Sequence, residues 1–366
     1  MQKKIIDLAV AGLASTAAFA QSNVTIYGIA DVGIAQVRST GQLTSTQVRS
    51  GALSTSRIGF KGVEDLGNGL KALFVLEYRL DVDGNNGIGG NYTNGQATAS
   101  GPARQQLVGL TGGFGTVAAG RLQTTAFDWQ VKYQALGATA FDVTNNLAAK
   151  GDFRINATTD IRANNAVAYI SPSFGGVTVA LNHAFAAEQA NSTTASSLGA
   201  TLVGVYYDNG PLSVGFVGEK LQGNGALEAT ERTDLGLGVS YDFGVAKLKA
   251  TYQTTKNNAS GLTGLAGKFN AVGGIGAEIP VSTKGKVHVV YAQSDLKTTA
   301  ANDNGRGLSV AYTHDLSKRT TAYAGFSFID NAGNGVTYGQ TLAGGLAPAT
   351  LGGSSNVIAA GVRHMF

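Results

Sequence analysis

The side chains of this sequence that are best suited to act on a solute are basic residues at alternating positions. Arg57 and Lys61 point to one side of the segment 56–65, whereas Ile58 and Phe60 point to the other. Arginine stays charged at every working pH, so such residues would form a fixed positive surface that attracts anions.

The segments that follow repeat the arrangement. In residues 70–80, Lys71, Glu77 and Arg79 alternate with apolar side chains, and Arg104 continues the series in the next segment. Because successive side chains of a β-strand point to opposite faces, the charged residues of neighbouring strands would share one face of a sheet. The pattern therefore predicts a polar wall that carries several cations.

A candidate for the opposite side of this wall is the long stretch 123–161, which contains four aspartates and three basic residues. Long loops in compact proteins are usually functional, and charge rings at a narrow passage set ion preference. An ordinary surface loop is the alternative. The three aspartates that we expect at the passage are Asp128, Asp142 and Asp152; Asp160, Lys132, Lys150 and Arg154 lie in the same stretch.

No catalytic or metal-binding pattern competes with this interpretation. The four histidines, His183, His288, His314 and His364, fall on separate segments without metal-ligand spacing. The glycine clusters lack the Gly-Lys-Ser/Thr ending of a phosphate-binding loop. We therefore expect no enzyme activity, no metal and no cofactor, although a barrel with a catalytic rim leaves no local signature that would rule it out.

The elements that must position these residues are best seen at the end of the sequence. Residues 355–366 alternate: Ile358, Val362 and Phe366 lie on one face, and Arg363 lies on the other. A strand that ends the chain on an aromatic residue is typical of a transmembrane β-barrel of the outer membrane, in which the last strand closes the sheet.

The beginning of the sequence predicts export. A basic start at Lys3 and Lys4 precedes a mostly apolar stretch and the small residues Ala18 and Ala20. This is the pattern of a secretory signal peptide over 1–20, and cleavage would leave 346 of the 366 residues, 21–366, as one barrel domain.

Composition limits the class of protein. The chain has no cysteine, five prolines and 52 glycines, which suits many turns without disulfides. After residue 20 no apolar run approaches the roughly 20 residues of a spanning helix. Removing the charges of Lys3, Lys4 and Asp7 leaves 25 basic and 22 acidic residues, a net charge of +3. That excess is too small to indicate a nucleic-acid partner.

The remaining chain reads as alternating segments of about ten residues, joined in turn by short and long connections. Seven short turns and eight long polar loops give fifteen connections and hence sixteen antiparallel strands. The pattern predicts an all-β, 16-stranded transmembrane barrel with short periplasmic turns and long outer loops. A soluble secreted β-sandwich would share the alternation but not the regular succession of short and long connections. Candidates for the aromatic girdles are Tyr27, Phe60, Phe74, Tyr78, Tyr312 and Phe366.

Three longer motifs resemble the general diffusion porins of Gram-negative bacteria, and most closely the neisserial and betaproteobacterial type. They are Val24-Thr-Ile-Tyr-Gly-Ile-Ala-Asp31, Ser56-Arg-Ile-Gly-Phe-Lys-Gly-Val-Glu-Asp-Leu-Gly-Asn-Gly-Leu-Lys-Ala72 and Val108-Gly-Leu-Thr-Gly-Gly-Phe-Gly-Thr-Val117. Gly120-Arg121, residues 171–176 and the closing residues 361–366 extend the resemblance over essentially the whole mature chain.

The resemblance implies a trimer in the cell outer membrane, with the third loop folded into the pore. It also implies that Arg121, which strand parity alone does not assign, faces the lumen, and that Arg162 joins the wall at the start of the sixth strand. A serine is common in the family where Ala166 stands. We expect a passive channel, lodged among outer-membrane lipids, for ions and small hydrophilic solutes.

The expected constriction wall is Arg57, Lys61, Arg79, Arg104, Arg121 and Arg162, facing the loop aspartates. The number of wall arginines predicts a weak preference for inorganic anions, which the aspartates would offset in part. Two alternatives remain open at this point: a substrate-specific channel of the same architecture, and a barrel used mainly as an adhesin or surface antigen.

Overall fold

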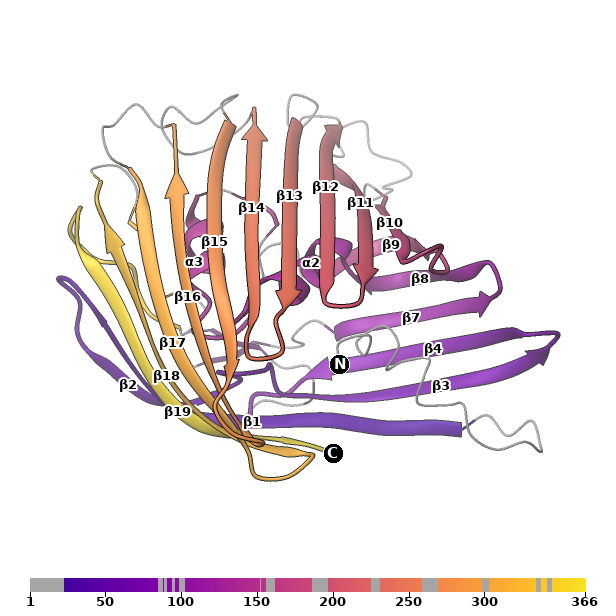
Figure 1. The fold of residues 1–366 in the computed structure, drawn as a ribbon, viewed down its shortest axis with the longest axis horizontal. Helices are drawn as coiled ribbons and strands as arrows, with labels where there is room; N and C mark the ends of the chain where they lie inside the picture. Colours follow the sequence, from indigo (N-terminus) through magenta and orange to yellow (C-terminus); the bar gives the residue numbers. More distant parts are fainter. Residues whose placement is uncertain are drawn as a thin grey trace.

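The structure is a computed structural model. It describes residues 23–84, 88, 91–93, 96–98, 103–151, 153–155, 162–185, 197–224, 231–258, 269–297, 303–333, 337–340 and 344–366. Most of these residues form an antiparallel sheet that closes on itself, with two helices inside it (Figure 1). The expected signal peptide, 1–20, and Asp152 lie outside the described residues.

The first nine strands of the main sheet are β1 (Asn23–Ser39), β2 (Ser45–Ser50), β3 (Arg57–Gly67), β4 (Leu70–Arg79), β7 (Ala103–Gly112), β8 (Gly115–Gln123), β9 (Arg162–Ile170), β10 (Val177–Ala184) and β11 (Ser197–Asn209). The others are β12 (Leu212–Asn224), β13 (Glu231–Asp242), β14 (Lys247–Asn257), β15 (Phe269–Pro280), β16 (Gly285–Asp295), β17 (Gly305–Asp315), β18 (Thr320–Asn331) and β19 (Ser354–Met365). A separate small hairpin consists of β5 (Asn91–Thr93) and β6 (Gln96–Thr98).

Two of these strands occupy a single position in the barrel. β1 pairs with β2 through Val32–Val37 and with β3 through Asn23–Ile29, so β2 and β3 succeed each other along the same edge of β1. The 17 assigned strands of the sheet therefore form a closed 16-stranded barrel, which confirms the predicted strand number.

The last strand closes the barrel as its alternation predicts. β19 pairs with β1 from Ile29 opposite Met365 to Ser39 opposite Ser355. Beyond this ladder, Phe366 N donates to Gly28 O over 3.1 Å, and Gly28 N donates to Phe366 O over 3.0 Å. A Cβ at Gly28 would lie 2.3 Å from the Phe366 ring, so only glycine lets the terminal aromatic residue cover this position.

The two faces of the barrel differ as expected for a sheet that crosses a membrane. On β1, Val24, Ile26 and Ile34 point outward with about 60% of their surfaces exposed, whereas Asp31 is fully buried on the inner side. So much exposed apolar surface is unusual on a soluble protein but suits contact with lipid. The expectation for one girdle candidate is wrong: Tyr27 lies on the inner side, where its hydroxyl contacts Glu77.

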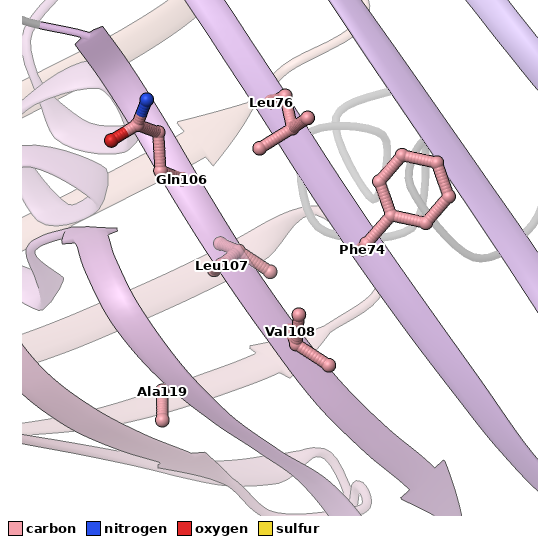
Figure 2. A pocket seen from close by; sticks show the side chains of 6 residues that line it. All are labelled: Phe74, Leu76, Gln106, Leu107, Val108 and Ala119. Atoms are coloured by element: carbon pink, nitrogen blue, oxygen red, sulfur yellow. The ribbon is translucent and has the colours of Figure 1, made fainter.

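The outer surface of β4, β7 and β8 carries a shallow apolar groove, with Gln106 at one end (Figure 2). Phe74 and Val108 are opposite each other in the sheet, as are Val108 and Ala119, so the three side chains form one lateral row.

The connections alternate in length, as predicted. Tight turns join β3 to β4 and β7 to β8, for example, whereas the connection from β8 to β9 contains α2 (Thr125–Tyr133) and α3 (Val143–Lys150). Among the described residues, neither helix is long and apolar enough to cross a membrane.

The two helices lie inside the barrel, α2 behind β12 and β13 and α3 behind β15 and β16 in the view of Figure 1. α2 contacts β10 to β14 and α3 contacts β15 to β18. The third long connection is therefore folded into the lumen, as predicted, and packs against one half of the barrel wall.

Candidate pore constriction

We call residues 124–155, which contain α2 and α3, the inner loop. Glycines on the strands make room for it. A Cβ at Gly238 or Gly215 would lie within 2.4 Å of the Tyr133 ring, so these positions admit no larger residue unless α2 moves. Further glycines that face the inner loop in this way are Gly204, Gly236, Gly274, Gly276, Gly307 and Gly325.

Buried aromatic residues fill the space that the glycines leave. Trp129 is fully buried and its Nε1 donates to Gly215 O over 2.9 Å, while the hydroxyl groups of Tyr133 and Ser213 are 2.9 Å apart. Phe141 packs farther along the same wall, against β17 and β18, and its carbonyl oxygen accepts from Ser309 Oγ over 2.6 Å. The inner loop therefore has a fixed position against β11 to β18.

Polar side chains of the wall also hold the backbone of the inner loop. Lys249 Nζ donates to Gln134 O over 3.2 Å, and Asp234 Oδ1 accepts from Arg154 N over 3.1 Å. The Arg154 guanidinium in turn donates to Glu219 over 2.9 Å. These side chains are largely buried, so each would be costly to leave without its partner.

Asp142 belongs to this internal framework. It is buried and caps α3, because its side chain accepts from Asn145 N and from Ala138 N, each over 2.9 Å. Burial raises the pKa of Asp142 to about 7. The structure therefore places Asp142 at a helix end rather than beside the wall arginines.

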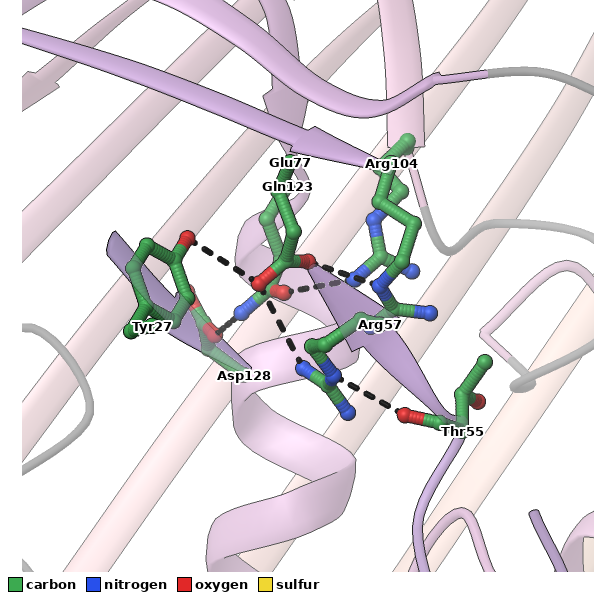
Figure 3. Close-up of polar contacts among 8 residues, drawn as sticks. Tyr27, Thr55, Arg57, Glu77, Arg104, Gln123 and Asp128 are labelled. Carbon is green, nitrogen blue, oxygen red and sulfur yellow. Dashed lines mark hydrogen bonds and ion pairs between the residues drawn. The ribbon is translucent and has the colours of Figure 1, made fainter. Parts of the chain in front are cut away.

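The opposite wall carries the basic cluster. Glu77 on β4 is 3% exposed and lies between two arginines: Arg104 Nε is 2.6 Å from Glu77 Oε1, and Arg57 Nη1 is 3.7 Å from Glu77 Oε2 (Figure 3). The Tyr27 hydroxyl donates to Glu77 over 3.1 Å. A buried carboxylate with two guanidinium groups fixes both cations at the lumen surface.

Arg162, at the start of β9, extends this cluster toward the inner loop. Its Nη2 donates to Gln123 Oε1 over 3.0 Å, and its guanidinium lies 5.1 Å from the centre of the Phe127 ring. Arg162 also interacts electrostatically with Arg104, Arg57, Glu77 and Asp128. The wall and the inner loop therefore meet at this residue.

Asp128, on α2, is the acidic residue that the inner loop brings to the cluster. Gln123 donates its side-chain amide to Asp128 (Figure 3). Burial raises the pKa of Asp128 to about 6, against the opposing effects of the hydrogen bond from Gln123 and the charge of Arg162. Asp128 is therefore an acid whose charge changes near neutral pH.

The other basic residues of the expected wall lie around this centre. Arg79 is opposite Arg57 in the sheet and pairs with Asp81 over 2.7 Å, and Lys61 lies 5.3 Å from the centre of the Tyr27 ring.

The structure does not bring Arg121 to the cluster. Arg121 on β8 is opposite Gln106 on β7, and both lie on the outer face of the sheet, which also carries the exposed Val108. The Arg121 guanidinium donates to Ala103 O and to Asn164 Oδ1 over 2.5 Å each.

The sequence prediction gave Glu77 no part in the constriction, although the structure places it at the centre of the cluster. Strand parity had assigned its side chain to the lumen with Lys71 and Arg79. The available signal was a single acid among basic residues of one face, which indicates an internal counter-ion. In the parts of the chain that the structure describes, no group of His, Cys, Asp or Glu residues could hold a metal ion.

The fold and this site define a class of protein: a membrane-spanning β-barrel whose polar lumen narrows between an inner loop and a wall of arginines. The family model of Gram-negative porins matches residues 8–334. The chain belongs to this family.

Two curated relatives illustrate the similarity. Outer membrane porin protein 32 of Delftia acidovorans is 38% identical over 378 aligned residues, which cover 100% of both chains. Major outer membrane protein P.IB of Neisseria meningitidis is 32% identical over 195 residues, which cover 50% of each chain.

Solved structures agree. An anion-selective porin from Comamonas acidovorans superposes with a TM-score of 0.75 at 32% identity, over 94% of this chain and 100% of that chain. The trimer form of OmpT from Vibrio cholerae superposes with a TM-score of 0.65 at 15% identity, over 94% of this chain and 99% of that one, and shows the same fold. The protein is thus an outer-membrane porin, a passive channel, and its relatives are channels rather than enzymes.

Proposed function

We propose that the channel passes inorganic anions and small hydrophilic solutes, with a preference for anions that arises at the cluster of Arg57, Arg104 and Arg162. Arg79 and Lys61 continue the positive surface on either side. The observation that carries the proposal is the arrangement around Glu77: two arginines pair with one buried acid and Arg162 interacts electrostatically with all three, so the wall keeps a net positive charge. Fixed charge at a narrow passage lowers the free energy of the counter-ion there and raises that of the co-ion. Homology to an anion-selective porin supports the same preference.

Reversal potentials in planar bilayers under a potassium chloride gradient test this proposal. We expect a potential of the sign that indicates chloride preference, and a smaller one when Arg57, Arg104 and Arg162 are replaced together by glutamine. A wild-type potential that favours potassium would contradict the proposal and leave the channel function in place.

We propose further that the channel is a homotrimer that needs no catalysis or cofactor. The trimer form of a structural relative supports this assembly. Small or apolar outward side chains on strands near both chain ends, such as Ala30, Val32 and Ala360, suit contact with a second copy. Cross-linking in native membranes should give a ladder that ends at three subunits; a ladder that ends at two would contradict the trimer.

We also propose that residues 1–20 are a signal peptide, so that the mature protein is the barrel domain 21–366. The basic start, the apolar stretch and the small residues before Gln21 support this. N-terminal sequencing of protein from outer membranes should begin at Gln21. A mature protein that begins at Met1 would contradict the proposal.

A further inference from the structure

A second inward segment lies beside the inner loop. Residues 51–56 connect β2 to β3, and we call them the strap. Ala52 is 1% exposed and belongs to the same buried cluster as Phe141, Leu136 and Ala140 of the inner loop. The strap therefore runs on the lumen side of the wall.

One carboxylate organises the strap. Asp31 Oδ2 accepts from Leu53 N over 3.0 Å and from Ser54 N over 2.6 Å. The backbone of Asp31 is bound as well, because its carbonyl oxygen accepts from Gly51 N over 2.9 Å and its N donates to Ser56 Oγ over 2.9 Å. A fully buried carboxylate that accepts several hydrogen bonds fixes the groups around it more firmly than a neutral side chain would.

The strands that close the barrel hold the same carboxylate from its other side. Tyr323 on β18 donates its hydroxyl to Asp31 Oδ1 over 2.6 Å. Arg363 on β19 donates to Ser54 Oγ over 3.1 Å and to Thr321 Oγ1 over 3.2 Å. The strap is thus attached to the three strands β18, β19 and β1, where the two ends of the barrel sheet meet.

The strap in turn contacts both sides of the constriction. Ala52 O accepts from Ala140 N over 2.8 Å, which holds the inner loop between α2 and α3. Thr55 O accepts from Arg57 Nε over 2.9 Å, which holds one of the wall arginines (Figure 3). A short covalent segment therefore links the inner loop to the wall.

We propose that Asp31 is a positioning residue of the constriction: through the strap it fixes the inner loop and the Arg57 guanidinium relative to each other. This inference rests on the proposed anion preference, because position matters only if the cluster selects ions. Asp31 itself opposes that preference by its charge. Removing the charge alone would therefore strengthen the preference for anions, whereas releasing the strap would weaken it and let the current fluctuate.

Loss of the charge and release of the strap change the anion preference in opposite directions, so two variants that lose the same charge can separate the two effects. Asp31→Asn keeps an oxygen that can accept from Leu53 N and Ser54 N, whereas Asp31→Ala keeps none. In single-channel recordings we expect Asp31→Ala to raise the open-channel current noise about twofold or more and to lower the anion-to-cation permeability ratio about twofold. Asp31→Asn should keep the noise of the wild type and its preference or a slightly stronger one.

Each outcome supports or overturns the proposed role of Asp31. Equal changes in the two variants would show that only charge matters and would overturn the inference, as would an Asp31→Ala channel that behaves like the wild type. If Asp31→Ala does not fold, Tyr323→Phe removes a single hydroxyl group, and unchanged noise in that variant would overturn the inference. A wild-type channel without anion preference would instead refute the proposed function, so the two failures are distinguishable.

Discussion

Replacing Glu77 by glutamine should strengthen the anion preference of the channel. Glu77 is the buried acid that lies 2.6 Å from Arg104 and 3.7 Å from Arg57, and glutamine has nearly the same shape without the charge. The change therefore leaves Arg57 and Arg104 beside a neutral side chain and removes the acid that partly balances their charge and that of Arg162.

The magnitude follows from Coulomb's law. A unit charge acts on an ion that passes at ~6 Å with about 0.7 kcal/mol in water, and 0.1 M salt screens this to about 0.4 kcal/mol. Losing the negative charge lowers the free energy of the anion at the constriction and raises that of the cation, each by this amount. The difference between the two ions therefore changes by about 0.8 kcal/mol, and the anion-to-cation permeability ratio should rise roughly fourfold.

The assay is the reversal potential of purified channels under a tenfold salt gradient. A matched control is Glu64→Gln, which removes the same charge from an exposed residue at the far end of β3 and should leave the ratio unchanged. Breaking a buried pair costs up to about 3–5 kcal/mol, so the unfolding midpoint of each variant must be measured as well. A folded Glu77→Gln channel whose ratio stays the same or moves toward cations would refute the reasoning.

Three further predictions concern the inner loop and the closure of the barrel. Burial raises the pKa of Asp128 to about 6, so lowering the pH from 7.5 to 5 should remove its charge and increase the anion preference, with a midpoint near that value. Its folded-state pKa lies above the ordinary 3.8, so its contribution to stability is present below about pH 4 and is lost as the pH rises through about 6. Gly238→Ala would place a Cβ 2.4 Å from Tyr133 and should destabilise the packing of α2 against the barrel wall by about 1–3 kcal/mol. We expect a larger open-channel current noise as the result. Deleting Phe366 removes two backbone hydrogen bonds to Gly28 and should lower the unfolding midpoint in detergent.

Each of the three has a control. Asp128→Asn should abolish the pH dependence, and a titration that persists would assign it to another group. Gly218→Ala is the control for Gly238→Ala, because its Cβ would meet no side chain closer than 3.5 Å. Equal current noise in both variants would contradict the prediction that Gly238 makes room for α2. Phe366→Leu keeps the two backbone bonds, so it should lose less stability than the deletion.

How far the sequence predicts the constriction depends on the kind of residue. Arg57 follows from alternation, because a strand that contacts lipid on one face fixes the direction of every side chain. Arg104 shares the parity of the outward Gln106 and Val108, and it reaches Glu77 because the pairing of β4 with β7 shifts register between Glu77 and Tyr78. Arg121 lies on the face that it shares by alternation with Val117 and Ala119, whereas the family resemblance implied that it faces the lumen. The inner loop was predicted by its length and position, yet Asp142 is a helix cap, which no count of loop aspartates reveals.

The sequence by itself determined that this chain is a transmembrane β-barrel, because the alternation and the succession of short and long connections are local signals and a membrane permits few folds that satisfy them. The resemblance of its longer motifs added the porin family. Only the tertiary structure decided which charges meet. Glu77 comes next to Arg57 and Arg104 because neighbouring strands have a particular register, and Asp31 reaches Tyr323 because the barrel closes and brings together residues 292 positions apart. Distances of that kind depend on closure and packing, which no segment of the chain encodes alone.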